Sequence, residues 1–270
     1  MNPDDQGQGF NVRFDNVRCV FEHQSGRLVN ALDGVSFEVP DGQLVAIVGR
    51  SGHGKSTLLR VLAGLQPTTS GVVKVGSKIV EGPGVERSMV FQQDTVFPWM
   101  SVRDNVEFGV KAQGMSKDRR REVSDRWLRA VQLEEFAGSW PRELSGGMRK
   151  RVALASVLAT GSAVWLMDEP FGSLDYFTRR TLHDLLLELW AETRKTVFFV
   201  THDIEEALIL ADRVLLVRDG KVVEDLEVHL PRPRDEDVRA SQAAVQLTKS
   251  IIENLGASSK TDVTDLVPEV

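Results

Sequence analysis

Residues 49–56 read Gly-Arg-Ser-Gly-His-Gly-Lys-Ser, which is a complete G-x-x-x-x-G-K-[ST] pattern. The three glycines let the backbone curl without Cβ clashes, so that successive N–H groups and the N-terminus of the following helix point at one anion. Lys55 adds a positive charge, and the Ser56 hydroxyl is suited to holding Mg²⁺. The pattern predicts a loop that binds the phosphates of a nucleoside triphosphate. A flexible glycine-rich turn is the alternative.

The sequence on either side of this loop favours phosphate binding. Leu44 to Val48 is apolar and follows a Pro-Asp-Gly turn, which predicts a buried strand running into the loop. Apolar residues then recur at helical spacing from Leu58 until Gly64 and Pro67 end the pattern. Strand, loop and helix therefore stand in the order that nucleotide binding requires. The residues expected to contact the nucleotide here are Gly49, Arg50, Ser51, Gly52, His53, Gly54, Lys55, Ser56 and Thr57.

Composition limits the classes of protein that fit. The chain has 270 residues, 41% hydrophobic and 27% charged, which suits one large domain or two intimately joined ones. The formal net charge of -6 argues against nucleic acid as a partner. A single cysteine, Cys19, excludes an internal disulfide, and we find neither a signal peptide nor an apolar run that could span a bilayer. We expect a soluble, cytoplasmic chain.

Two kinds of element are expected around the phosphate loop. Val12 to Phe21, Val35 to Val39 and Val72 to Val80 alternate in the manner of strands and predict an antiparallel β layer. A helical insert follows over about 100–160, and Ser101 is expected to cap its first helix.

Alternation of strands and helices returns in the second half of the chain. The expected strands are 163–167, 196–200 and 213–217, and the expected helices are 175–193 and 203–211. Such alternation predicts a parallel sheet covered by helices. Beyond Pro231 the sequence becomes polar and acidic, with at most one helix near Val238 to Asn254. The predicted division is a nucleotide-binding domain over 10–231 and a polar tail over 232–270.

Two carboxylates end a predicted strand. Asp168 and Glu169 follow the apolar run from Val164 to Met167. In doubly wound folds ligands bind at the C-terminal ends of the strands, so both acids are expected to face the phosphates. Asp168 suits a Mg²⁺ role, and Glu169 suits the orientation and polarisation of the attacking water. Simple helix capping is the alternative reading.

A second anion site is expected at Leu144-Ser145-Gly146-Gly147-Met148, where Ser145 caps a following helix. With these motifs in this order, roughly residues 10–231 resemble the ATP-binding subunits of ABC transporters. In that family LSGG binds the γ-phosphate of an ATP held by the other protomer. The resemblance therefore implies a homodimer that sandwiches ATP against Ser145, Gly146 and Gly147.

The resemblance also assigns roles to residues that local patterns leave open. Gln92 matches the Q-loop glutamine, which links Mg²⁺ and the lytic water to the transmembrane contact, and Asp175 matches the D-loop aspartate. His202 matches the switch histidine that contacts the γ-phosphate; a structural histidine is the alternative. Phe21 aligns with the aromatic residue that stacks on adenine. The implied catalytic residues are Glu169, His202 and Gln92, and the implied metal ligands are Ser56, Gln92 and Asp168.

The implied fold is an α/β P-loop NTPase cassette with a RecA-like parallel-sheet core, an antiparallel β subdomain and a helical subdomain, and its implied ligands are ATP and Mg²⁺. Two residues depart from the family pattern. Met148 stands where glutamine is commoner, and Phe21 where tyrosine is common. Neither departure removes a phosphate ligand, and stacking on adenine survives because Phe has the same π-face.

The leading hypothesis is the ATPase of a membrane importer. Chromosomal ABC-type ATPases insert a long coiled coil between the phosphate loop and LSGG, and ribosomal ones carry two cassettes; this sequence has neither. A kinase or GTPase leaves Leu144 to Met148 and His202 unexplained. A soluble ABC-type ATPase outside transport, or an importer subunit for another solute, remains the alternative.

The segment Phe97-Pro98-Trp99-Met100 is either a plug of the core or a groove for a membrane partner. We favour the groove because aromatic residues and Met suit a partner pocket, and we expect an integral membrane permease to contact Gln92 to Met100. With Glu224 to Arg234, the Pro-Trp element looks like the nitrate, sulfonate and taurine importer branch. That resemblance implies a small anionic solute, an extracytoplasmic solute-binding protein and a peripheral position on the cytoplasmic face of the membrane.

Overall fold

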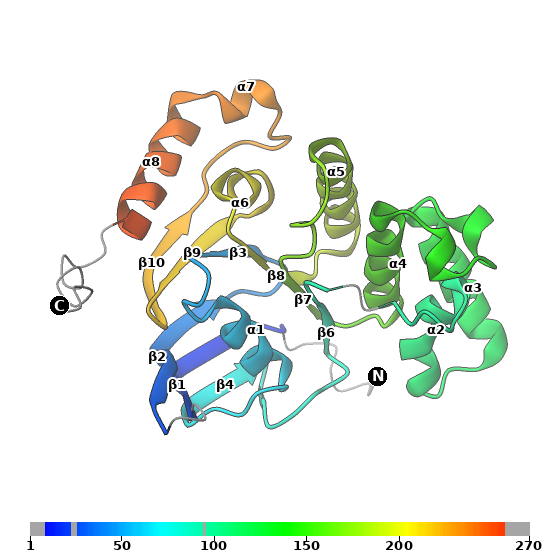
Figure 1. Ribbon diagram of the computed structural model, residues 1–270, viewed down its shortest axis with the longest axis horizontal. Coiled ribbons are helices and arrows are strands. Elements are labelled where there is room, and N and C mark those ends of the chain that lie inside the picture. Colours follow the sequence, from blue (N-terminus) through cyan, green and yellow to red (C-terminus); the bar gives the residue numbers. More distant parts are fainter. Residues whose placement is uncertain (1–8, 23–25, 94–95, 257–270) are drawn as a thin grey trace, which may run out of the picture.

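The computed structural model describes residues 9–22, 26–93 and 96–256, which form two sheets and the helices around them (Figure 1). The central sheet has the strand order β10-β9-β3-β8-β7-β6 and is parallel except at β10, whereas the order β2-β1-β4-β5 forms an antiparallel sheet. The strands are β1 (Val12–Glu22), β2 (Leu28–Val39), β3 (Leu44–Val48), β4 (Ser70–Val75), β5 (Lys78–Ile79), β6 (Arg87–Val90), β7 (Val164–Asp168), β8 (Thr196–Thr201), β9 (Arg213–Arg218) and β10 (Lys221–Glu227). The predicted α/β cassette with a parallel core and an antiparallel β subdomain is confirmed.

Alternating side chains of the central strands feed two hydrophobic cores. Along β3, Val45 and Ile47 face helix α1 (Lys55–Ala63) and the antiparallel sheet, while Leu44, Ala46 and Val48 face the opposite side. The α1 helix lies between the two sheets (Figure 1). Because both faces are covered, the central strands are continuous apolar runs rather than alternating ones.

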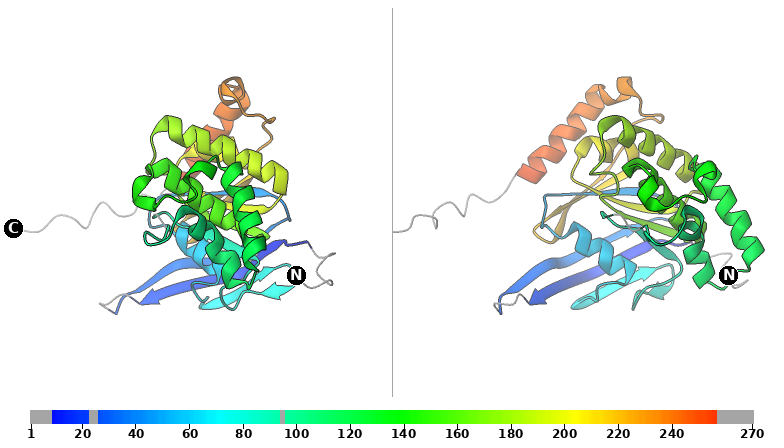
Figure 2. Two further views of the ribbon diagram at one scale, coloured as in Figure 1. Left: turned by 90° about the vertical axis from the view of Figure 1, so that its right-hand side faces the viewer. Right: turned by 45° about the vertical axis from the view of Figure 1, so that its right-hand side comes forward.

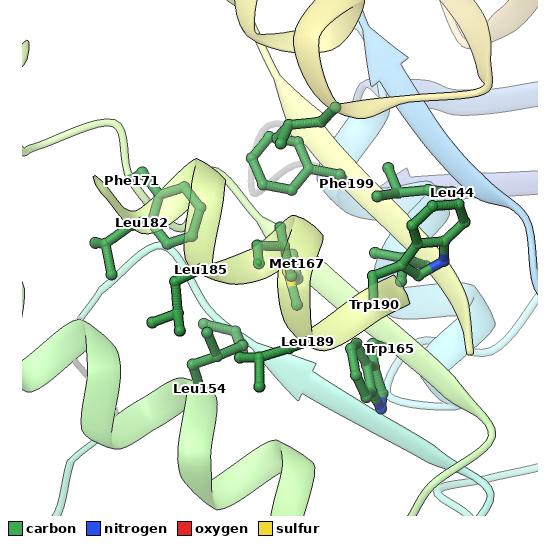
Figure 3. Close-up of a cluster of buried hydrophobic side chains, with 14 of the residues drawn as sticks. Leu44, Leu154, Trp165, Met167, Phe171, Leu182, Leu185, Leu189, Trp190 and Phe199 are labelled. Carbon is green, nitrogen blue, oxygen red and sulfur yellow. The ribbon is translucent and has the colours of Figure 1, made fainter. Parts of the chain in front are cut away.

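The second face of the central sheet is covered by α4 (Gly146–Ala159), α5 (Tyr176–Thr193) and α6 (Ile204–Leu210). Figure 3 shows the leucines of α5 packed against Met167 of β7 and Phe199 of β8. The helical periodicity that predicted this amphipathic helix is confirmed, and Asp175 caps it by accepting a hydrogen bond from Thr178 N.

Two further helices, α2 (Val102–Ala112) and α3 (Lys117–Ala130), pack with α4 at the β6 end of the sheet (Figure 2). Short 3₁₀ turns η2 (Glu134–Phe136) and η3 (Pro141–Glu143) connect α3 to α4. Ser101 caps α2 as expected, accepting from Asp104 N at 3.1 Å. In the part of the chain that the structure describes, no helix has both the length and the apolar character needed to cross a bilayer.

The segment after Pro231 differs from the expectation. It forms two helices, α7 (Glu236–Arg239) and α8 (Gln242–Gly256), where at most one was predicted. Asp235 caps α7 by accepting a hydrogen bond from Val238 N at 3.0 Å. The high density of charged residues here gave no apolar periodicity from which this short helix could be predicted. The α8 helix contacts α6 and β9 and buries Ala244 and Ile251, so this part of the polar segment is packed on the central domain.

Candidate active site

The phosphate loop joins β3 to α1, and its glycines are required by geometry. Gly54, the residue before α1, has φ +101° and Gly52 has φ +81°, both in the left-handed region. A Cβ on Gly49 would lie 2.2 Å from the carbonyl oxygen of Val217, and one on Gly54 would lie 2.3 Å from that of Ala31. The expected curled loop is therefore present, with neighbouring strands packed directly against its backbone.

Lys55 occupies the centre of this loop. Its Nζ donates to the carbonyl oxygens of Gly49 at 2.8 Å and Arg50 at 3.1 Å. Burial lowers the pKa of Lys55, and the nearby carboxylates of Glu169 and Asp168 oppose that shift. The loop thus closes around an ammonium group that is available to a phosphate once it leaves its two carbonyl partners.

Not all side chains of the predicted loop face the same way. The His53 ring accepts a hydrogen bond from Asp219 N at 3.1 Å, and His53 O accepts one from Gly220 N at 3.1 Å. These bonds tie the loop to the turn between β9 and β10. Arg50 and Ser51 are exposed, and Thr57 is half-buried in the first turn of α1. Because the His53 ring is bonded to Asp219, the contact with the nucleotide that we expected of His53 would be made by its backbone N–H.

Ser56 and Asp168 meet beside the loop. The Ser56 hydroxyl donates to Asp168 Oδ1 at 2.9 Å. Asp168 is only 4% exposed, and burial raises its pKa although the Ser56 hydrogen bond opposes the shift. Two hard oxygen donors are thus held together at the N-terminus of α1, which is a suitable pair for a divalent cation.

Glu169 brings together the residues that the sequence assigned to catalysis. Its Oε2 accepts from Gln92 Nε2 at 3.4 Å and lies 3.1 Å from His202 Nδ1. Its Oε1 lies 3.9 Å from Lys55 Nζ. These four side chains follow or lie near the C-terminal ends of β3, β6, β7 and β8, all at one edge of the sheet. An ammonium and an imidazole that both lie within 3.9 Å of one carboxylate can position a water and a phosphate.

The segment Leu144 to Met148 and the D-loop aspartate Asp175 form a second cluster. Ser145 caps α4, accepting from Met148 N at 3.2 Å. A Cβ on Gly147 would lie 2.7 Å from Thr178 of α5, so that this glycine lies against the helix that Asp175 caps. Hydrogen bonds from Thr178 lower the pKa of Asp175. Among the described residues, no hydrogen bond or ion pair links this cluster to the phosphate loop.

Phe21 lies apart from both clusters. It is on the exposed end of β1, opposite Val29 of β2, and is 38% exposed. The ring is available for stacking, and we find no ring contact for it in the described part of the chain. Among the described residues, no hydrogen bond or ring contact joins Phe21 to Asp168 or Glu169.

One site residue was missed by the sequence argument. Lys150 of α4 is buried, and its Nζ donates to the carbonyl oxygen of Gln92 at 2.9 Å. This hydrogen bond connects α4, the helix that Ser145 caps, to the segment that carries Gln92. Local sequence could not indicate this role, because Lys150 stands between Arg149 and Arg151 in a basic run that is typical of a solvated helix face.

The aromatic loop after Gln92 borders a cavity of about 230 Å³ between β6, α2 and α4. Phe97 lines this cavity and stacks in tilted geometry between Phe108 at 4.6 Å and Trp99 at 5.5 Å between ring centroids. The buried side chain of Asn105 holds the loop by accepting from Phe97 N and donating to Met100 O. Trp99 itself is 67% exposed, which contradicts the core-plug reading for this residue.

Comparisons with known proteins agree with this geometry. A family model described as ABC transporter matches residues 32–172. The taurine import ATP-binding protein TauB of Rhizobium johnstonii is 44% identical, with 88% of this chain and 92% of that protein covered. The nitrate import ATP-binding protein NrtD of Synechocystis sp. is 46% identical, with 82% and 83% covered. A solved dimeric ATP-binding cassette in a post-hydrolysis state, bound to ADP and Pi, is 31% identical with a TM-score of 0.73, covering 81% of this chain and 99% of that one.

Proposed function

The chain belongs to the ABC transporter family and is an ATPase of that type, and from this premise we propose that it drives an importer for small anionic solutes of the nitrate, sulfonate or taurine kind. The observation that carries the mechanism is the convergence of Lys55, Gln92 and His202 on the carboxylate of Glu169. The solute class rests on the names of similar proteins and on the resemblance of the Pro-Trp element.

ATP is expected to bind along the phosphate loop. The backbone N–H groups from Gly49 to Thr57 and the N-terminus of α1 surround an anion, and Lys55 supplies the charge. Phe21 offers its exposed ring to the adenine. The oxygens of Ser56 and Asp168, 2.9 Å apart, fit Mg²⁺, and we assign Gln92 as a further ligand. When bound, the ion would offset negative charge on the phosphate oxygens.

Glu169 is proposed to orient the attacking water. Its Oε2 lies 3.1 Å from His202, so the imidazole can hold the carboxylate while its exposed side reaches the γ-phosphate. Gln92 donates to the same oxygen and so links the segment that leads to the aromatic loop with the hydrolytic carboxylate.

ATP binding is proposed to join two copies of the chain. Ser145, Gly146 and Gly147 stand at the N-terminus of α4, where the first backbone N–H groups of a helix have no partner within the helix. Among the described residues, no hydrogen bond or ion pair joins these three residues to the phosphate loop of the same chain. In a head-to-tail dimer these groups and Asp175 would face the nucleotide of the other copy. The dimeric form of the similar solved cassette supports this arrangement.

The membrane partner is proposed to dock at the cavity beside Phe97, where Phe108 of the lining is exposed and where the exposed ring of Trp99 packs on Phe97. An integral permease in this groove would hold the chain at the cytoplasmic face of the membrane, with an extracytoplasmic solute-binding protein in the same complex. The alternative is an ABC-type ATPase outside transport, or one serving another solute. Copurifying the complex and asking which solute, with its binding protein, raises ATP turnover tests the solute class.

Replacing Glu169 tests the hydrolytic role. Glu169→Gln keeps the shape of the side chain and should retain ATP binding while lowering hydrolysis by about 10² to 10⁴, the range of a positioned base. The matched control is Glu205→Gln, an exposed carboxylate on α6, which should hydrolyse ATP at the parent rate. Near-normal turnover in Glu169→Gln would contradict the proposed role.

A further inference from the structure

A buried series of hydrogen-bonded side chains, His183, Glu206 and Thr201, joins α5 to the end of β8, next to the Glu169–His202 pair. His183 of α5 is 5% exposed, Glu206 of α6 is 6% exposed, and His183 Nε2 lies 2.6 Å from Glu206 Oε1. The hydroxyl of Thr201, the last residue of β8, donates to the other carboxylate oxygen of Glu206. A buried network of this kind is costly unless every member is bonded, and here each of these groups has a partner.

This hydrogen-bonded series ends at Thr201 and Asp203, the two residues that flank His202. Thr201 Oγ1 also accepts from Asp203 N at 3.0 Å, so the hydroxyl bridges both neighbours of His202. Asp203 then caps α6 by accepting from Glu205 N and Glu206 N, and Arg179 of α5 lies 3.5 Å from its carboxylate. The turn that carries His202 is therefore held at both sides by bonds that lead back to α5 and α6.

His183 also touches the segment that follows Glu169. Its ring lies 5.6 Å from the ring of Phe171, which is buried over the first turns of α5 beside Leu182 (Figure 3). Phe171 in turn packs on Phe199 of β8, at 5.8 Å between centroids. One side chain thus contacts the turn after Glu169 and, through Glu206 and Thr201, the turn of His202.

We propose that His183 is a positioning residue that, through Glu206 and Thr201, holds His202 within hydrogen-bond reach of Glu169. Sequence alone did not indicate this role, because His183 and His202 are on different elements. The proposal rests on the proposed hydrolytic roles of Glu169 and His202. Its consequence is that loss of His183 changes the hydrolytic step rather than nucleotide binding, since within the described residues no hydrogen bond or ion pair joins the side chains of His183, Glu206 or Thr201 to the phosphate loop.

The test compares single and double variants of the full-length chain. His183→Ala should lower kcat by about tenfold and change KM for ATP by less than about twofold, because the interaction acts on the hydrolytic geometry. His183→Gln, which keeps a donor for Glu206, should recover most of kcat. In a His202→Ala background, His183→Ala should lower kcat by less than about a further twofold, because its effect passes through the missing imidazole.

A structural control separates positioning from stability. Trp190→Phe removes the hydrogen bond from Trp190 Nε1 to Lys195 O at the other end of α5, and should lower the melting temperature without changing kcat. If His183→Ala does not fold, Thr201→Val interrupts the same series of hydrogen bonds at its other end, and it should lower kcat to a similar extent.

Two results would overturn the proposal: parental kcat in a folded His183→Ala or Thr201→Val protein, or an equal fall in kcat whether or not His202 is present. The hydrolytic proposal is tested apart from this one by Glu169→Gln, which leaves His183 and Glu206 unchanged. Loss of turnover in Glu169→Gln together with parental turnover in His183→Ala would reject the positioning role alone.

Discussion

Truncation of Trp99 to alanine separates the two roles considered for the aromatic loop. Trp99 is 67% exposed, so about a third of it is covered within the chain, and its ring contacts that of Phe97. If a large aromatic side chain offers about 250 Å² in total, about 80 Å² is already buried, worth at most ~2 kcal/mol at ~25 cal/mol per Å². The isolated subunit should therefore lose no more than about 2 kcal/mol of folding stability.

The larger effect is expected on association. A partner that covers the remaining two-thirds of Trp99, about 165 Å², would gain up to ~4 kcal/mol from it. Because each 1.4 kcal/mol is a factor of ten, Trp99→Ala should weaken binding to the membrane subunit by about 30-fold to 1000-fold, that is by ~2 to 4 kcal/mol. A core plug predicts the reverse pattern, with ~3 to 5 kcal/mol lost from the isolated fold.

The assay measures melting temperature, isolated ATP turnover and copurification with the membrane subunit on the same protein. Trp165→Ala is the buried control, since that side chain is 2% exposed and its loss should destabilise the isolated fold strongly. Trp140→Ala is the surface control, since that side chain is 42% exposed and, unlike Trp99, makes no ring contact with Phe97; it should leave copurification unchanged. A destabilised Trp99→Ala protein that still binds its partner once folded would refute the assignment of the groove.

Two further predictions concern the nucleotide site. Burial raises the pKa of Asp168, so its ionised form destabilises the nucleotide-free fold at pH values above that raised pKa. The effect declines as the pH falls below the raised pKa and is absent below the ordinary pKa of the unfolded chain. Asp168→Asn should therefore raise the melting temperature at neutral pH, and a gain that persisted in acid would contradict this. Ser145→Arg should keep ATP binding but abolish the ATP-dependent dimer of Glu169→Gln in sedimentation, and a monomeric Glu169→Gln parent at saturating ATP and Mg²⁺ would count against the sandwich.

Elements whose signal is local could be predicted from the sequence. The strand before the phosphate loop, the helix after it and the caps at Ser101 and Ser145 depend on residues within a few positions of each other. The strand β2 was predicted only from Val35, whereas it begins at Leu28. Its first three residues, Leu28 to Asn30, are exposed, and they are held by pairing with β1, from Glu22 opposite Leu28 onward, which is a contact that no local pattern reports.

The segment after Pro231 was underestimated for a similar reason. The polar composition beyond Pro231 predicted a tail, yet Arg234 is 6% exposed and donates to carbonyl oxygens at the end of α6, including Leu208 O and Ala211 O. Burial lowers the pKa of Arg234 to about 10. The guanidinium donates to the last carbonyl oxygens of α6, which no glycine follows. Residues 208 and 234 are far apart in the sequence, so local patterns could not predict this contact.

The conformation of Glu169 explains how two consecutive carboxylates serve one site. Successive side chains of a strand point to opposite faces, and along β7 Val164 and Leu166 face α1 while Trp165 and Met167 face α4 and α5. Asp168 continues this alternation toward α1 and reaches Ser56, whereas an extended Glu169 would turn away from the phosphate loop.

Glu169 instead has φ +42°, while its N–H still donates to Val200 O at 3.0 Å. The left-handed turn lets its carboxylate approach Lys55 and His202 on the same side of the sheet as Asp168. Such a conformation costs about 1 to 3 kcal/mol in a non-glycine residue. The strand pattern predicted that both acids end β7, but only this backbone strain, held in place by the bond to β8, makes them neighbours of the same phosphate loop.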